Sequence, residues 1–304
     1  MKAIRIHEPV GIEGLVYEDA PEPAPAVGDV LVEVRACGFT ASELYWPIST
    51  DRNGHERSAV IPAQEFSGVV VELGFGTAGV AVGDEVYGLI DAYRDGAAAE
   101  LIAVEARDVA PKPTSVDHVH AAALPQAGLT SWQALFTHGG LTAGQTVVIH
   151  GAAGAVGSMA IQLARTVDAR VITTGRAGHR SVALELGAED FFDLEEDAWE
   201  EAVGQADLVL DTIGGDILER SPAIVRPGGA LISVVAPPPN ARDGIRTLNF
   251  IREQSGPQLA EIARLVDAGE VRPQVGAVYP LAEGREAFAA KSASGIPGRV
   301  ILRP

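Results

Sequence analysis

The chain has 304 residues, of which 47% are hydrophobic, and carries a formal net charge of −18. That much apolar sequence builds one large core or two ordinary ones, and the single cysteine, Cys37, excludes an intramolecular disulfide and favours a reducing, cytoplasmic location. The negative charge, with no basic cluster and no apolar run of membrane-spanning length, leads us to expect no nucleic-acid partner and no membrane association.

The first third of the chain is rich in short strand candidates. Turns of Gly, Pro and Asp separate six stretches of strand-like composition, at residues 3–6, 14–17, 30–34, 66–73, 84–90 and 99–104. This spacing predicts a compact barrel-like domain, which we place at residues 1–120.

Strands and helices alternate in the middle of the chain, after two helix-like stretches at 118–124 and 130–136. The alternation predicts a doubly wound parallel sheet, and so an α/β fold, in a domain at 121–252. We expect strand 247–251 at the sheet edge, where an unpaired strand offers a surface for a homodimer. The predicted strands are 147–149, 170–174, 208–211, 230–235 and 247–251, and the helices between them include 155–165, 180–186 and 215–225.

The alternation ends after residue 252. Two predicted helices, 257–267 and 281–290, and two predicted strands, 275–279 and 299–302, make up a last segment at 253–304. We expect this segment to rejoin the first domain.

The turn between strand 147–149 and helix 155–165 carries the clearest functional signal. Positions 152, 154 and 157 match the dinucleotide-binding fingerprint G-x-G-x-x-G, with alanine at the first of them. Small residues let the backbone approach a pyrophosphate, which also meets the positive end of the helix dipole. A glycine-rich turn without a ligand is the alternative. The candidate phosphate-binding residues are Gly151, Ala152, Ala153, Gly154, Ala155, Val156 and Gly157.

The end of the next strand distinguishes the two nicotinamide cofactors. An acidic residue about 20 positions past the glycines would bind the ribose hydroxyl of NADH. Thr174 and Gly175 are followed instead by Arg176, His179 and Arg180, and arginines suit the 2′-phosphate of NADPH. We therefore expect NADPH, against the alternative that these are solvated residues at a helix start.

A third part of the expected cofactor site follows strand 208–211. Ile213 and Gly214 lie in a turn whose glycines allow a close approach to the nicotinamide half of the cofactor. Val235, at the end of strand 230–235, is placed in the same site.

Seven short segments, in this order and spacing, carry a family resemblance: Ala-Cys-Gly at 36–38, Glu-Phe-Ser-Gly-Val-Val at 65–70, Val-Gly-Asp-Glu-Val at 82–86, Gly-Leu-Thr-Ser-Trp at 128–132, the turn at 151–157, Leu-Gly-Ala at 186–188 and Gly-Arg-Val-Ile-Leu at 298–302. The chain resembles the medium-chain dehydrogenase/reductase superfamily, in its zinc-independent quinone oxidoreductase branch. The resemblance implies a catalytic domain with a GroES-like barrel and a Rossmann domain. It also implies cofactor contacts near the nicotinamide from Thr130, Phe250, Ile251 and Arg252.

Zinc-dependent members of this superfamily place two cysteines and a histidine around a catalytic metal. Cys37 matches the first cysteine, but Gln64 stands in place of the histidine and Ala127 in place of the second cysteine. A catalytic zinc needs three protein ligands, so we expect no metal. We expect His118 and His120, which have no cysteine partner, at the surface, and Cys37 in the core.

Without zinc, the hydride acceptor is expected to be a quinone or an α,β-unsaturated carbonyl. Hydride addition to either gives a delocalised phenolate or enolate, which hydrogen bonds suffice to stabilise. The resemblance implies that Thr40, Glu43 and Tyr45 lie in a segment beside the nicotinamide, with Thr40 in place of the family's asparagine. We expect Tyr45 and Thr40 to contact the substrate oxygen and Gln64 to form a polar wall, whereas a packing role for Tyr45 is the alternative.

The sequence thus predicts a zinc-independent, NADPH-dependent oxidoreductase that transfers hydride to a quinone or enone. Two alternatives stay open. One is an enoyl-thioester reductase, and the other is a non-catalytic NADPH-binding redox sensor, which the exchange at Thr40 keeps open.

Overall fold

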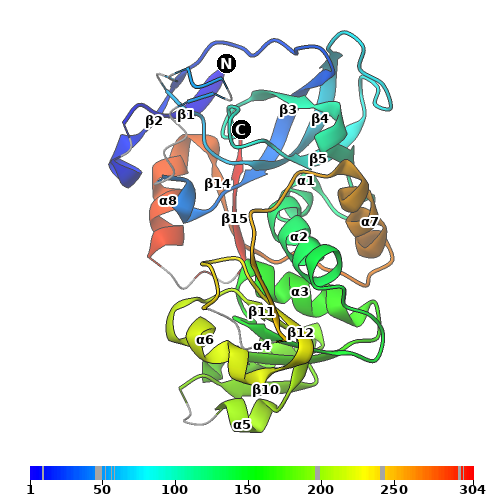
Figure 1. Cartoon of the computed structure of the whole chain (residues 1–304). Helices are drawn as coiled ribbons and strands as arrows, with labels where there is room; N and C mark the ends of the chain where they lie inside the picture. Colours follow the sequence, from blue (N-terminus) through cyan, green and yellow to red (C-terminus); the bar gives the residue numbers. More distant parts are fainter. Residues whose placement is uncertain are drawn as a thin grey trace. The chain divides into compact units, whose positions relative to one another are not determined.

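The computed structural model describes residues 1–8, 10–44, 50–51, 53–55, 57, 59–195, 199–239, 244–293, 296 and 298–304. By their internal contacts they form two compact units. The first comprises Met1–Gln126, Gln254–Ala268 and Pro273–Pro304, and the second comprises Ala127–Glu253 and Gly269–Arg272. Figure 1 labels most of the helices and several of the strands of each unit. Within the described residues, no helix is long and apolar enough to cross a membrane.

The first unit is built on a seven-stranded, mostly antiparallel sheet. Its strands run in the order β14, β15, β3, β4, β5 and β7, and β6 pairs with β3. Because β15 pairs with β3 at Cys37 and Gly38, the end of the chain is part of this sheet. The bounds are β3 Asp29–Gly38, β4 Glu65–Leu73, β5 Glu85–Leu89, β6 Leu101–Glu105, β7 Val109–Pro111, β14 Val275–Pro280 and β15 Arg299–Arg303, with a separate hairpin of β1 Lys2–Ile6 and β2 Leu15–Asp19.

Apolar side chains from this sheet, from the β1–β2 hairpin and from α8 form the core of the first unit, and α1 and α7 also belong to the unit. Phe39 stacks on Phe288 with ring centroids 3.7 Å apart, and the buried Tyr87 hydroxyl donates to the carbonyl of Leu259 at 2.5 Å. The stacking of Phe39 on Phe288 holds α8 against the core, and the hydrogen bond from Tyr87 joins β5 to α7. The helices are α1 His118–Ala121, α7 Gly256–Asp267 and α8 Gly284–Ser292.

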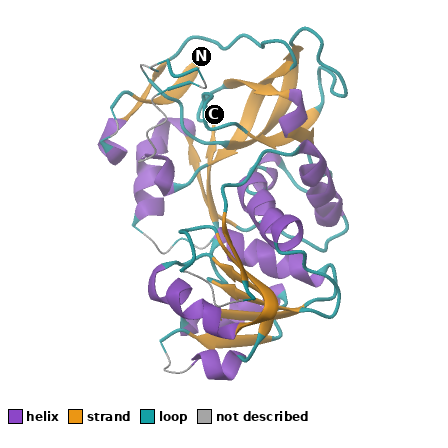
Figure 2. Ribbon diagram, viewed as in Figure 1, coloured by secondary structure: helices purple, strands orange, loops and turns teal. Residues whose placement is uncertain are grey.

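The second unit has a six-stranded sheet in which every strand pair is parallel. The strand order β10, β9, β8, β11, β12, β13 is that of a Rossmann sheet, whose ligands bind at the carboxyl ends of the strands beside the point where the order reverses. Figure 2 shows helices flanking these strands. The bounds are β8 Thr146–His150, α3 Ala155–Arg165, β9 Arg170–Gly175, α4 Arg180–Leu186, β10 Asp190–Asp193, α5 Trp199–Val203, β11 Ala206–Asp211, α6 Gly215–Arg220, β12 Val225–Ser233 and β13 Arg246–Asn249, and α2 Pro125–Trp132 precedes them.

The predicted fold class is confirmed, and the helices predicted at 155–165 and 180–186 coincide with α3 and α4. The strands predicted to reach residues 235 and 251 end earlier, at Ser233 and Asn249. After Ser233 the backbone N–H groups of Val235 and Ala236 turn onto the serine hydroxyl, which ends the strand pairing. The helix predicted at 215–225 ends at Arg220 and continues as a 3₁₀ turn that begins Ser221-Pro222, because proline has no N–H to continue an α-helix.

The sequence patterns missed β10 and α5. Both lie in a stretch that is rich in Asp and Glu. In β10 the buried positions are Phe191 and Asp193, and because one of them is a charged residue, the apolar–polar alternation of a strand is not visible in the sequence. The strand expected at the sheet edge, β13, does lie there. A homodimer through it stays a prediction, which the molar mass in solution tests.

Candidate cofactor site

Two glycines hold the shape of the turn after β8. Gly151 has a φ of +92°, and a Cβ on it would lie 2.3 Å from Thr212 Oγ1. At Gly157, in the first turn of α3, a Cβ would lie 2.1 Å from the carbonyl oxygen of Gly151. Glycine is therefore needed at both positions for helix and turn to pack this closely.

Gly154 has a different role, because its backbone is ordinary. Its φ of −71° and ψ of 162° suit any residue, and a Cβ would meet only the Gly151 carbonyl, at 3.4 Å. Gly154 is exposed, and α3 begins just after it, so the N–H groups of Ala155 and Val156 have no carbonyl partner within the helix. With Ala153 half-buried beside it, this is an open backbone edge at the positive end of a helix, which suits a pyrophosphate.

Ala152 and Thr174 tie the turn to β9. The N–H groups of Gly151 and Ala152 donate to the Thr174 carbonyl at 3.0 and 3.3 Å. Ala152 is fully buried, so the methyl group that replaces the first fingerprint glycine points into the interior. Thr174 and Gly175 are also buried, which makes them part of the framework here, and a cofactor contact from either stays a prediction.

His150 lies beneath the turn and is fully buried. Its Nδ1 is 2.7 Å from Thr174 Oγ1, and its Nε2 is 3.1 Å from Ser221 Oγ. Because Ser221 donates its only proton to the Ile217 carbonyl at 2.6 Å, the network assigns the ring proton to Nε2 and leaves Nδ1 as an acceptor. Burial lowers the pKa of His150 to about 4, so the ring is neutral at pH 7.

Because His150 is buried, we expect the free energy of unfolding to fall at acidic pH, and we expect His150→Asn to remove this part of the pH dependence. The unfolded chain binds a proton at His150 below about pH 6.5, whereas the folded chain does so only near pH 4, so the stabilisation is complete above pH 6.5 and is lost as the pH falls. Between pH 7.5 and 5 this costs the wild-type chain about 2 kcal/mol that the variant, which keeps a partner for Thr174, does not lose. Urea unfolding of both chains at the two pH values measures it, and equal losses would contradict the role of His150.

Arg176 and Arg180 follow β9 and are both exposed. The Arg180 guanidinium lies over the ring of Phe191, 5.0 Å from its centroid. Among the described residues, neither arginine has a carboxylate partner, although the chain has 41 acidic residues against 23 basic ones. His179 lies half-buried between them. Two unpaired cations next to the turn fit a bound phosphate.

The turns after β11 and β12 present the other predicted cofactor residues of this sheet. Ile213 is 41% exposed and Val235 is 52% exposed, and Gly214 has a φ of +78°. A Cβ on Gly214 would lie 2.9 Å from Val235 Cγ1, so the two turns touch. Apolar exposed side chains at a strand end provide a surface for a flat ring.

Four residues expected from the family resemblance are spread over other parts of the second unit. Thr130 is buried in α2, next to Ser131, whose hydroxyl donates to the Val156 carbonyl of α3 at 2.9 Å. Phe250 packs on His138 with centroids 4.6 Å apart. Ile251 is 80% exposed and Arg252 is half-buried. Their contacts with a cofactor stay predictions.

The candidate substrate residues belong to the first unit. Tyr45 and Trp46 lie outside the described residues. Thr40 donates its N–H and its hydroxyl to Glu43 Oε1, at 2.9 and 3.2 Å, so donation to a substrate would replace the hydroxyl bond. Glu43 also accepts the N–H of Ala63 at 2.8 Å and shapes this loop. Gln64 is largely buried, and its role as a polar wall stays a prediction.

The position that resembles a zinc ligand does not fit a metal. Cys37 is fully buried, as expected, and burial, with the negative charges of Glu43 and Glu65 nearby, raises the pKa of its thiol well above the usual range. Glu65 pairs with Arg299 and accepts the N–H of Gln126 at 2.9 Å. With Gln64 and Ala127 at the other two ligand positions, Cys37 lacks the partners that a catalytic zinc requires. Among the described residues, no group of three His, Cys, Asp or Glu side chains is placed to hold a metal.

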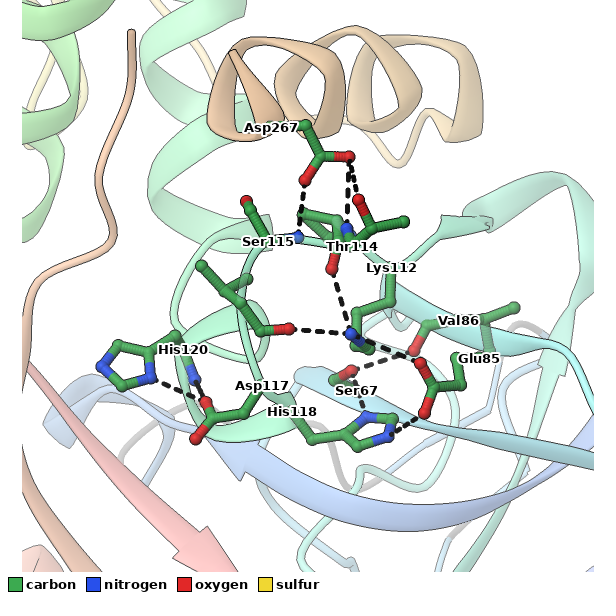
Figure 3. A network of polar contacts seen from close by, with 12 residues as sticks. Ser67, Glu85, Val86, Lys112, Thr114, Ser115, Asp117, His118, His120 and Asp267 are labelled. Atoms are coloured by element: carbon green, nitrogen blue, oxygen red, sulfur yellow. Dashed lines mark hydrogen bonds and ion pairs between the residues drawn. The ribbon is translucent and has the colours of Figure 1, made fainter. Parts of the chain in front are cut away.

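Figure 3 shows His118 and His120, which are two positions apart in the sequence and contact different residues. His120 is half-exposed and bonds Asp117 at 2.7 Å, as expected for a surface residue. His118 is mostly buried, contrary to expectation, because its Nδ1 lies 2.8 Å from Ser67 Oγ and its Nε2 3.3 Å from Glu85. The two histidines therefore hold the start of α1 against β4 and β5 and against Asp117.

The Rossmann sheet with its open glycine turn and adjacent arginines fits a dinucleotide-binding domain, and the comparisons with known proteins give the class of enzyme. Residues 26–114 match the alcohol dehydrogenase GroES-like domain, and residues 186–302 match the zinc-binding dehydrogenase family. A probable zinc-binding oxidoreductase of Arthroderma benhamiae is 31% identical over 98% of this chain and 96% of its own length. A mitochondrial NAD(P)H oxidoreductase of Homo sapiens is 28% identical over 92% of this chain and 79% of its own length.

Relatives of the quinone and enone type are also similar. An NADPH-dependent alkenal/one oxidoreductase of Arabidopsis thaliana is 29% identical over 80% of this chain and 64% of its own length. The solved quinone oxidoreductase of Coxiella burnetii superposes with a TM-score of 0.88 at 25% identity, covering 100% of this chain and 99% of that one. The chain belongs to the medium-chain dehydrogenase/reductase superfamily, in its zinc-independent, quinone oxidoreductase-like branch, and is an NAD(P)H-dependent oxidoreductase.

Proposed function

We propose that this enzyme uses NADPH to reduce a quinone or an α,β-unsaturated carbonyl without a metal. When bound, the cofactor supplies the hydride. The chain's own residues bind the cofactor's phosphates at Gly154 and the start of α3, hold the 2′-phosphate at Arg176 and Arg180, and exclude water. Tyr45, Thr40 and Gln64 are the candidate substrate contacts in this proposal.

The observation that most supports this substrate class is the set of side chains that accompanies Cys37. The chain has one cysteine, Gln64 and Ala127 stand where a catalytic zinc would need a histidine and a second cysteine, and the nearby Glu65 carboxylate pairs with Arg299. Reduction of a simple ketone places a full negative charge on one oxygen, which calls for an electrophile such as zinc. A quinone or enone spreads that charge over several atoms, so hydrogen bonds are sufficient.

The choice of NADPH over NADH rests on the residues that follow β9. Arg176 and Arg180 are exposed and lack a carboxylate partner among the described residues, and no acidic residue takes the place that a ribose hydroxyl needs. A mycobacterial relative of known structure, 26% identical with a TM-score of 0.85, was solved in complex with NADPH. It covers 100% of this chain. This relative is consistent with the proposed cofactor.

Steady-state oxidation of NADPH tests the proposal. We expect turnover with 1,4-benzoquinone and with methyl vinyl ketone, little with cyclohexanone, and no loss after treatment with a strong chelator. Turnover on crotonyl thioesters alone would favour the enoyl-thioester reductase, and tight NADPH binding without turnover on any acceptor would favour the redox sensor. The cytoplasmic location belongs to the same proposal.

A further inference from the structure

Asp211, at the carboxyl end of β11, is fully buried and organises the turn that follows it. Its Oδ1 accepts the backbone N–H groups of Ile213 at 3.1 Å and Gly214 at 3.0 Å. Charge-assisted hydrogen bonds of this kind are among the strongest in proteins, and in a buried site they have no water to compete with them. The buried Asp211 carboxylate therefore holds the turn after β11 in one conformation.

The same carboxylate reaches the next turn through Ser233. Asp211 Oδ2 accepts the hydroxyl of Ser233 at 2.8 Å, and the serine oxygen in turn accepts the N–H groups of Val235 and Ala236 at 3.2 and 3.3 Å. One buried acid thus fixes the residues after β11 and, by way of one hydroxyl, those after β12. Asn249 of β13 adds a bond to the Ser233 carbonyl at 3.0 Å.

The two turns meet at Gly214 and Val235. The backbone of Gly214, with φ +78° and ψ −164°, suits only glycine, and Val235 fills the space where its side chain would be. The two turns are therefore packed directly against each other at this point. The exposed faces of Ile213 and Val235 form one apolar edge beside them.

This edge lies on one side of β8, and the arginines lie on the other. In the sheet order β9 is the neighbour of β8 on one side, and β11 followed by β12 lie on the opposite side. A dinucleotide that spans the carboxyl ends of such a sheet places its two halves on opposite sides of the reversal point. With the 2′-phosphate at Arg176 and Arg180, the nicotinamide half falls to the β11 side.

We infer that Asp211 and Ser233 are positioning residues that hold the turns after β11 and β12 as a preformed seat for the nicotinamide half of NADPH. This inference rests on the proposed cofactor and deepens it. The pair touches no cofactor atom itself. It acts by fixing Ile213, Gly214 and Val235 before the ligand arrives, so that binding does not have to order them.

Two ligands separate this role from a general effect on folding. NADPH contains both halves of the cofactor, whereas adenosine 2′,5′-bisphosphate carries only the adenine half with the 2′-phosphate. We expect Asp211→Ala and Ser233→Ala to weaken NADPH at least about tenfold and the bisphosphate less than about twofold, since each substitution removes three hydrogen bonds that order the seat. Calorimetric titration of each chain with each ligand measures both affinities.

Conservative and matched variants complete the test. Asp211→Asn keeps an oxygen for Ile213 and Gly214 but presents an N–H group where the Ser233 hydroxyl needs an acceptor, so it should weaken NADPH less than Asp211→Ala does. Ser67→Ala removes an equally buried, hydrogen-bonded hydroxyl from the first unit and should change neither affinity. If Asp211→Ala does not fold, the affinities for NADPH and for the bisphosphate are compared in Ser233→Ala, which removes only one oxygen atom.

Equal losses for both ligands, or no loss of NADPH affinity in Ser233→Ala, would overturn the inference. Failure of the wild-type chain to bind either ligand would instead overturn the proposed function on which it rests. The two failures are therefore distinguishable in one set of titrations.

Discussion

Replacing Arg176 and Arg180 together by alanine is expected to remove the proposed preference of this enzyme for NADPH. Each exposed guanidinium that bonds the 2′-phosphate contributes about 1.5–3 kcal/mol, so the double variant should bind NADPH more weakly by a factor of a hundred or more, about 3 kcal/mol. NADH lacks that phosphate, and its affinity should change less than about threefold. Titration of the variant with both cofactors measures the two effects.

A nearby arginine provides the control for this result. Arg170, at the start of β9, is half-exposed and pairs with Asp190 at 2.6 Å, at the opposite end of the strand from the glycine turn. Arg170→Ala removes one positive charge from the same unit but should leave both affinities unchanged. If the double variant lost affinity equally for NADPH and for NADH, this would contradict binding of the 2′-phosphate by the two arginines.

The glycine turn predicts two opposite phenotypes for the same substitution. Gly157→Ala places a methyl group 2.1 Å from the Gly151 carbonyl, so α3 must move. We expect a loss of about 2–3 kcal/mol in the free energy of unfolding, together with weak NADPH binding. Gly154→Ala meets only a 3.4 Å contact with ordinary backbone angles, so it should cost at most about 1 kcal/mol.

Gly154→Ala should nevertheless weaken NADPH at least about tenfold, because its methyl group would lie where we propose that the pyrophosphate approaches the backbone. Thermal unfolding and NADPH titration of both variants test the pair of expectations. A stable Gly154→Ala chain that binds NADPH as tightly as the wild type would contradict phosphate binding at this turn. A Gly157→Ala chain as stable as the wild type would contradict the close packing of α3.

The strongly periodic parts of the fold were predictable from sequence. The continuous apolar strand β8, the amphipathic α3 and the glycines between them follow simple rules of burial and backbone freedom, and their bounds came out close to prediction. Strand ends were harder, because they depend on a single contact. Nothing local to Ser233 indicates that its hydroxyl would accept two N–H groups and end β12 two residues early.

The buried polar residues beneath the site were also beyond sequence reasoning. Asp211 was noted as the start of a glycine turn, but its bond to Ser233 joins residues 22 positions apart on neighbouring strands. His150 adjoins the fingerprint, yet its partners Thr174 and Ser221 are 24 and 71 positions away. Such contacts depend on the register of the parallel sheet, which no pattern in one sequence specifies. A polar residue at the carboxyl end of a predicted parallel strand is the one signal that pointed toward them.

Equilibrium titration of the unaltered chain with NADPH and with NADH, under identical salt and pH, is the most direct test of the central claim. The account predicts that NADPH binds about a hundredfold more tightly, which corresponds to about 3 kcal/mol from the contacts of the 2′-phosphate. Equal affinities, or tighter binding of NADH, would contradict an NADPH-dependent enzyme and the role given to Arg176 and Arg180.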